Sequence, residues 1–114
     1  MRGGVTLPKE TRNVRKQRLK NDLTTQLKRD GKLQSYWSDL VNDYLTFWEI
    51  KEKLKIDIER NGAMVIIKNG SQVFRKRNDA VVEMPKISKR MTDILEVLDI
   101  KSTIPDGDDE DDDY

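Results

Sequence analysis

The chain of 114 residues contains no cysteine and no histidine. Without cysteine it can form neither a disulfide framework nor a cysteine-based zinc or iron–sulfur site. Without histidine it lacks the usual general base and half of each Ser-His or Cys-His nucleophile pair. Its longest apolar run, residues 63–67, is far shorter than the ~20 residues of a membrane helix. We therefore expect a soluble, non-enzymatic protein with no cofactor, no bound metal and no membrane contact.

The low content of hydrophobic residues limits the size of the core. They make up 35% of the chain and charged residues 38%, against roughly 25% charged in a typical soluble domain. Leu, Ile, Val and Phe still form about a quarter of the sequence, which is above the ~20% level that signals disorder. We expect a single domain over residues 11–104, preceded by a flexible basic lead-in over residues 1–10.

Charge of one sign is concentrated at each end of the chain. The net charge is only +1, but residues 1–32 carry a net +7 and residues 105–114 a net −7. The acidic segment repels itself and is predicted to be a disordered tail. A function must therefore account for both a basic head and an acidic tail.

Apolar spacing predicts a mainly α fold with three helices. The first covers residues 11–29, where leucines recur every fourth position as a narrow stripe, and Gly31 ends it. The second and longest covers residues 35–61, with Ser35 as its N-cap. At ~1.5 Å per residue, this long helix extends about 40 Å.

A β-hairpin and a third helix complete the predicted fold. The hairpin covers residues 63–75 and turns at Asn69-Gly70, because both residues tolerate the positive φ of a type I′ turn. The helix covers residues 78–98 and begins with asparagine, a good N-cap. Pro85 lies inside this helix and should kink or divide it, since proline removes a backbone hydrogen bond.

The long helix over residues 35–61 has an apolar arc of about 180°, wider than the ~100° stripe of an ordinary surface helix. Two interpretations remain open: the whole arc packs within its own chain, or one edge packs against a second subunit. A small domain gains most from the second arrangement. That interpretation predicts a homo-oligomer with an interface formed by Trp37, Val41, Tyr44, Leu45 and Trp48.

Basic residues form two clusters that suit a nucleic-acid backbone. In the head, one side of the helix would carry Arg12, Arg15, Lys16 and Lys20, one turn apart. Counterion release from phosphates would make their binding strongly salt-dependent. They can also form a solvated helix surface, but their density favours a polyanion. The cluster around the hairpin can follow a nucleic-acid backbone or solubilise an exposed sheet edge. The predicted DNA-binding residues are Lys9, Arg12, Arg15, Lys16, Arg18, Lys20, Lys28, Arg29, Lys68, Arg75, Lys76 and Arg77.

The acidic tail has three possible roles: an inert solubiliser, a docking peptide for a basic partner, or an intramolecular competitor of the basic head. Its acids resemble no calcium loop, so no metal site is predicted there. The predicted docking residues are Asp108, Asp109, Glu110, Asp111, Asp112 and Asp113.

Several short motifs occur in the order long helix, hairpin, final helix. They are YLTFW at 44–48, IERNG at 58–62, NG at 69–70, RKRN at 75–78 and the closing segment 91–100. In these features, over residues 36–100, the chain resembles the small subunit of bacteriophage terminases, in its compact branch. Two positions depart from that pattern: Asp79 stands where proline is frequent, and Asp99 where glycine is usual.

The resemblance implies a non-enzymatic factor for viral genome packaging. Such proteins form rings, recognise double-stranded viral DNA, load it onto the large terminase subunit and modulate the ATPase and nuclease of that subunit. They act in the cytoplasm of the infected bacterial host. On this basis we expect the basic head to contact DNA and the apolar helix to build the ring. The acidic tail would dock the large subunit or tune the affinity for DNA.

Two other functions fit the same sequence. One is a small dimeric nucleic-acid-binding regulator of the repressor or antitoxin type. The other is a structural phage adaptor without a DNA role. A dimer in solution would argue against a ring, and binding of DNA would argue against the adaptor.

Overall fold

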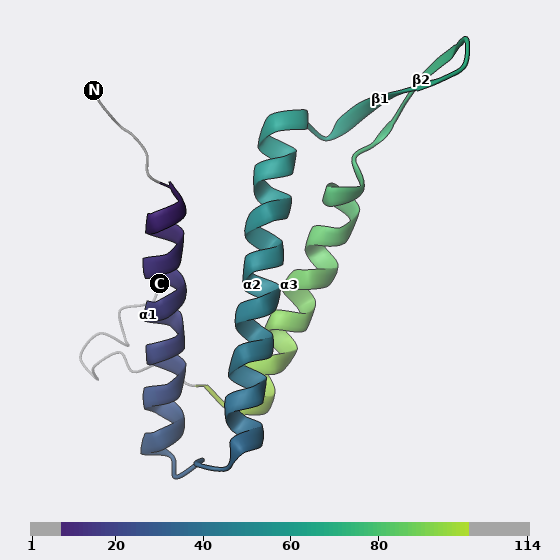
Figure 1. Cartoon of the computed structure of the whole chain (residues 1–114). Coiled ribbons are helices and arrows are strands. Elements are labelled where there is room, and N and C mark those ends of the chain that lie inside the picture. Colours follow the sequence, from purple (N-terminus) through teal and green to yellow (C-terminus); the bar gives the residue numbers. More distant parts are fainter. Residues whose placement is uncertain (1–7, 101–114) are drawn as a thin grey trace, which may run out of the picture.

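The structure is a computed structural model that describes the backbone of residues 8–100 and the side chains of residues 11–100 (Figure 1). The elements follow the order α1 Pro8–Arg29, α2 Ser35–Asn61, β1 Met64–Asn69, β2 Gln72–Arg77 and α3 Asp79–Leu98. Helix α2 lies between α1 and α3, and the hairpin extends beyond the end of the helices. The predicted mainly α fold with one hairpin is confirmed. No helix in this part of the chain is long and apolar enough to cross a membrane.

Helix α1 ends in the turn that its Gly31 predicts. The Lys32 N–H donates to the Leu27 carbonyl at 2.8 Å, and the Gly31 N–H to the Lys28 carbonyl at 3.1 Å. These two bonds form a Schellman motif, in which the residue just past the end of the helix adopts the left-handed conformation. Gly31 takes that position with φ 77°, which glycine adopts without steric cost.

Helix α3 ends in the same way, but with an aspartate in the left-handed position. The Ile100 N–H donates to the Leu95 carbonyl at 3.2 Å, and the Asp99 N–H to the Glu96 carbonyl at 3.0 Å. Asp99 has φ 59° and ψ 46°. Aspartate is one of the few residues with a side chain that visits this region. The backbone therefore explains why glycine would suit this position, where the resemblance predicts it.

Helix α2 has the predicted bounds but not the predicted cap. Gln34 occupies the N-cap position and makes no side-chain capping bond. Its Oε1 instead accepts a hydrogen bond from Trp37 Nε1 at 3.1 Å. Ser35 is the first helical residue, so the assignment of Ser35 as the cap is wrong. At the other end, the Gly62 N–H donates to the Ile58 carbonyl at 2.8 Å.

The hairpin turns one residue later than predicted. Strands β1 and β2 pair antiparallel with Asn69 opposite Gln72, so the loop between them is Gly70-Ser71. Only Gly70 has a positive φ there, 65°. A positive φ at the first central residue alone is the pattern of a type II′ turn, which requires glycine at that place. The predicted type I′ turn is therefore wrong, and the strands continue to Arg77.

Helix α3 begins at the predicted cap. Asn78 accepts the N–H of Ala80 on its Oδ1 at 3.0 Å, and Asp79 places a negative charge in the first turn, where it suits the helix dipole. Pro85 does not divide the helix, which runs unbroken from Asp79 to Leu98. Pro85 is exposed, so the lost backbone bond and the bulk of the ring fall on the solvent side. Of the two predicted effects of Pro85, a kink or a division, the division is therefore wrong.

The core lies where the three helices meet, at the end away from the hairpin (Figure 1). Leu98 of α3 is 0% exposed and Val41 of α2 is 2% exposed. The side chain of Lys32 spans the same end, because its Nζ donates to the Leu98 carbonyl at 2.8 Å. The buried cluster consists of Leu23, Leu27, Val41, Leu45 and Leu98. The hairpin and the N-terminal half of α1 therefore lie outside this core.

Candidate nucleic-acid interface

The basic residues of α1 lie on two sides of the helix. One side of α1 carries the leucine stripe that packs on the core, and toward the N-terminus the same side carries cations. Lys16 lies three residues before Leu19, and Arg12 lies four residues before Lys16. Both cations are only partly exposed. This side of α1 faces α2, which carries acidic residues at the matching positions.

Lys16 and Glu49 form the closest ion pair between α1 and α2, at 2.6 Å from Nζ to Oε2. Their side chains are 40% and 34% exposed. The hydrogen bond from Lys16 lowers the pKa of Glu49, and the charges of Lys16, Lys53 and Arg12 lower it further. The charge of Lys16 is therefore offset within its own chain.

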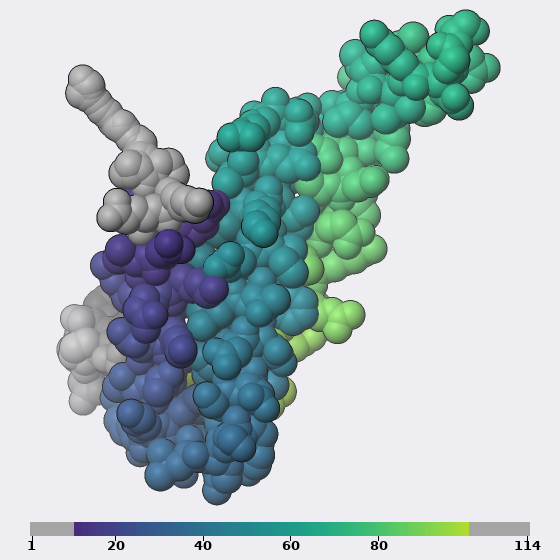
Figure 2. All heavy atoms as spheres, in the orientation of Figure 1, coloured from purple at the N-terminus to yellow at the C-terminus, as the bar shows by residue number. Residues whose placement is uncertain are grey.

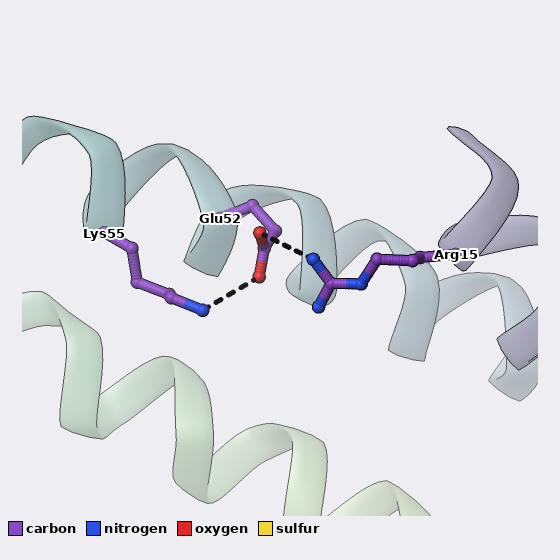
Figure 3. A network of polar contacts seen from close by, with 3 residues as sticks. All are labelled: Arg15, Glu52 and Lys55. Carbon is purple, nitrogen blue, oxygen red and sulfur yellow. Dashed lines mark hydrogen bonds and ion pairs between the residues drawn. The ribbon is translucent and has the colours of Figure 1, made fainter. Parts of the chain in front are cut away.

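Glu52 forms a second polar link between the same helices (Figure 3). Its carboxylate lies between Arg15, at 3.8 Å, and Lys55, at 3.3 Å, and its side chain is only 13% exposed. The Arg15 guanidinium also lies 5.5 Å above the ring of Trp48, an arrangement that attracts a cation to the aromatic face. Arg15 thus packs α1 onto α2, although the sequence predicted it as a DNA contact.

The pair of Lys16 and Glu49 leads to a prediction about pH. Because the folded pKa of Glu49 lies below its ordinary value of 4.5, the pair stabilises the fold fully above about pH 4.5. This contribution is lost as the pH falls through the folded pKa. Lys16→Gln should raise the pKa of Glu49 toward 4.5, as measured by NMR titration of its carboxyl carbon. Lys53→Gln is the control, because it removes a smaller contribution. An unchanged midpoint in Lys16→Gln would contradict the pair.

Four other basic residues of the head are exposed and have no ion-pair partner among the described residues. No salt bridge joins Arg18, Lys20, Lys28 or Arg29 to another residue within the described part of the chain. All four are exposed. Lys28 and Arg29 lie in the last turn of α1, where the helix dipole favours cations. These residues form the part of the head whose charge remains available to a ligand. The side chain of Lys9 lies outside the described ones.

The hairpin separates its basic residues onto two faces. Residues opposite each other across the strands share a face, and so do residues two apart along one strand. Lys68 lies opposite Val73, Ile66 opposite Arg75 and Met64 opposite Arg77. These six residues lie on one side, which we call the cationic face of the hairpin.

Lys76 lies on the other face, opposite Val65, and pairs with Asp79 at 3.5 Å. The run of three cations at 75–77, which the sequence presented as one patch, is therefore divided. Arg75 and Arg77 remain together with Lys68, and no salt bridge within residues 11–100 involves any of these three.

The sequence did not predict that exposed apolar side chains lie beside the cations on the cationic face. Met64 is 44% exposed, Ile66 65% and Val73 63%. The hairpin stands out from the body of helices (Figure 2), so no helix covers these side chains. Alternation along each strand could have placed them beside the cations, had the register of the hairpin been known.

The predicted oligomer interface divides into buried and exposed residues. Val41, Leu45 and Trp48 are 2%, 3% and 6% exposed and are buried within the chain. For these three, the structure supports packing within the chain over contact with a second subunit. Trp37 and Tyr44 retain exposed surface, and burial raises the pKa of Tyr44. Only this pair remains available from the predicted set.

The predicted docking residues of the acidic tail lie outside the described residues. They are Asp108, Asp109, Glu110, Asp111, Asp112 and Asp113. Within residues 11–100, no cluster of acidic side chains is arranged to hold a metal ion. The candidate interface therefore consists of the outer side of α1, which carries Arg18, Lys28 and Arg29, and the cationic face of the hairpin.

Comparison with known proteins identifies the family of this chain. The model of the family described as "Phage terminase, small subunit" matches residues 21–101. Neither the curated proteins nor the solved structures yielded a match. The matched region includes residues 21–29 of α1 and all of α2, the hairpin and α3. Since this is well over half of the chain, the protein belongs to the family of phage terminase small subunits, which take part in genome packaging in the infected host cell with phage DNA and the large subunit.

Proposed function

We propose that this protein recognises the phage genome and delivers it to the large terminase subunit, without catalysing a reaction itself. The observation that supports this function is the distribution of cations that form no salt bridge within residues 11–100. Arg12 is held close to the acids of α2, and Arg15 and Lys16 pair with them. The outer side of α1 and the cationic face of the hairpin remain available to phosphates.

The outer side of α1 suits the phosphate backbone rather than the bases. Its cations, including Arg18 and Arg29, are exposed on a helix without intervening aromatic residues. Phosphate contacts of this kind position a protein on DNA without reading its sequence. Each phosphate that is neutralised releases counterions, so binding weakens linearly with the logarithm of the salt concentration.

We also propose a ring-forming homo-oligomer in which the exposed parts of Trp37 and Tyr44 contact a neighbouring subunit. The acidic tail would then dock the large subunit and modulate its ATPase and nuclease. A dimeric regulator and a structural adaptor remain the alternatives. Membership in the terminase family favours the packaging function over both.

The double variant Arg18→Gln/Arg29→Gln tests the outer side of α1. We expect it to weaken binding to random-sequence duplex DNA and to reduce the slope of log K against log salt by about 2, at ~0.9 per phosphate contact. Fluorescence anisotropy at several salt concentrations measures both quantities. The fold should not change, because both side chains are exposed and form no salt bridge within the described residues.

The matched control is Arg15→Gln/Lys16→Gln, which also removes two positive charges, but from the side of α1 that faces α2. This variant should retain most of the salt slope. An unchanged slope in the double variant would show that DNA does not use the outer side of α1. Failure of the wild-type protein to bind any duplex would contradict the proposed function and favour the structural adaptor.

A further inference from the structure

The hairpin has an unusual composition for an exposed element. Residues 64–77 contain four cations, Lys68, Arg75, Lys76 and Arg77, and no acidic residue. Three of these cations alternate with three exposed apolar side chains on the cationic face. An isolated two-stranded hairpin is marginally stable in water, so such a surface favours a partner that supplies both negative charge and apolar contacts.

The base of the hairpin is held firmly against the helices. The Asn78 N–H donates to the Ala63 carbonyl at 2.8 Å. The Asn78 side chain donates to Asp57 Oδ1 and to the Gly62 carbonyl, both at 2.9 Å. These bonds join the end of α2, the start of β1 and the start of α3. The hairpin is thus a projecting ribbon with a fixed direction.

Charge distinguishes between two candidate partners for the cationic face, a second copy of this chain and a polyanion. A second copy that used the same face would bring Lys68, Arg75 and Arg77 against the same three cations. Like charges that are placed together at an interface cost several kcal/mol. A polyanion complements all three cations instead. The apolar residues then require apolar groups on the polyanion, and phosphate and sugar alone do not supply them.

Duplex DNA supplies both kinds of group in its major groove. The groove is about 12 Å wide and admits a two-stranded β-ribbon. With six residues in each strand, the ribbon is roughly 20 Å long, and its strands lie about 5 Å apart. Arginine and lysine bind the O6 and N7 atoms of guanine, and apolar side chains contact the methyl group of thymine.

We propose that the cationic face of the hairpin enters the major groove and reads base edges there. Lys68, Arg75 and Arg77 hydrogen-bond to guanine, and Ile66 and Val73 contact thymine methyl groups. The outer side of α1 then supplies contacts to phosphates, and the hairpin supplies sequence preference. This inference rests on the proposed function, because it names the element that recognises the genome.

The test selects a sequence from a randomised duplex pool with the full-length protein. We expect the wild type to enrich a sequence that contains guanine and thymine. The variant Lys68→Gln/Arg75→Gln/Arg77→Gln should lose this enrichment and bind the enriched duplex on the order of 10- to 100-fold more weakly, the discrimination typical of a bidentate contact to a base. Lys76→Gln is the matched control, because it removes one cation from the opposite face of the same strand, and it should enrich the wild-type sequence.

Two further probes test the base contacts directly. The enriched duplex with 7-deazaguanine in place of guanine lacks N7, and the same duplex with uracil in place of thymine lacks the methyl group. Both should bind the wild type more weakly. The variant Ile66→Ser/Val73→Ser removes the apolar groups of both side chains and should lose only the sensitivity to uracil. Circular dichroism and mass measurement confirm that each variant keeps its fold and subunit number.

Several results would overturn the inference. The triple variant could enrich the wild-type sequence, the Lys76→Gln variant could lose as much affinity, or the modified bases could bind equally well. A triple variant with a changed subunit number would identify the face as an interface between copies. Binding of DNA without sequence preference would reject the hairpin as a reader and leave the proposed function intact. Only a wild-type protein that binds no duplex would reject both.

Discussion

Replacing Leu98 by alanine is expected to lower the free energy of unfolding by about 3–4 kcal/mol. Leu98 is 0% exposed and packs in the cluster where α3 meets leucines of α1 and α2. The substitution removes apolar contact area and leaves a cavity that the rigid helices fill only in part. Domains of this size are stable by about 5–15 kcal/mol, so the loss is a large fraction of the total. Denaturant unfolding followed by circular dichroism measures it.

The control is the preceding residue. Val97 is 58% exposed, and Val97→Ala should change the free energy of unfolding by no more than about 0.5 kcal/mol. Both substitutions remove methyl groups from the last turn of α3 and replace them with the same residue. Equal losses in the two variants would mean that the burial of Leu98 in the core is not what stabilises the end of α3.

Replacing Asn78 by alanine is expected to lower the free energy of unfolding by about 2–3 kcal/mol. The residue is 6% exposed. Its Oδ1 caps α3 at the Ala80 N–H, while its Nδ2 donates to Asp57 and to the Gly62 carbonyl. The substitution removes all three bonds and leaves the Ala80 N–H buried without its partner. Thermal and denaturant unfolding measure the loss.

Two further variants separate the roles of this side chain. Asn61 also donates to Asp57 Oδ1, at 3.0 Å, but is exposed, so Asn61→Ala should cost no more than about 0.5 kcal/mol. Asn78→Asp keeps the capping oxygen and places a second carboxylate against Asp57. We expect this variant to be destabilised at neutral pH and to recover as acid protonates one carboxylate. If Asn61→Ala and Asn78→Ala lose equal stability, the joint does not depend on Asn78.

Local sequence signals predicted the helices well and the hairpin turn less well. The end of helix α2 was predicted correctly because a glycine such as Gly62 is the usual positive-φ residue directly after the last turn of a helix. Asn69 and Gly70 both accept positive φ, so the sequence alone did not determine which two residues form the loop. The pairing of the strands determines it, and it places Gly70 first in the loop.

The candidate site was predicted as a set of cations but not as a geometry. Helical projection could have shown that Lys16 continues the leucine stripe and faces inward. Its partner Glu49 belongs to another helix, and no local pattern identifies that contact. In the hairpin, the period of two separates Lys76 from Arg75 and Arg77 as soon as the strand is assigned. The exposure of the apolar residues beside them depends on the direction in which the hairpin projects.

The contact between α1 and α2 is apolar at one end and ionic at the other. The two halves of α1 therefore differ in the free energy that holds them against α2. Near Leu23 and Leu27 the contact is apolar and buried, whereas near Arg15 and Lys16 it consists of ion pairs and a cation–π contact. Ionic strength screens the second kind of contact and leaves the first almost unaffected. Added salt therefore favours local detachment of the N-terminal half of α1 from α2. The half that contains Leu23 and Leu27 stays packed against α2.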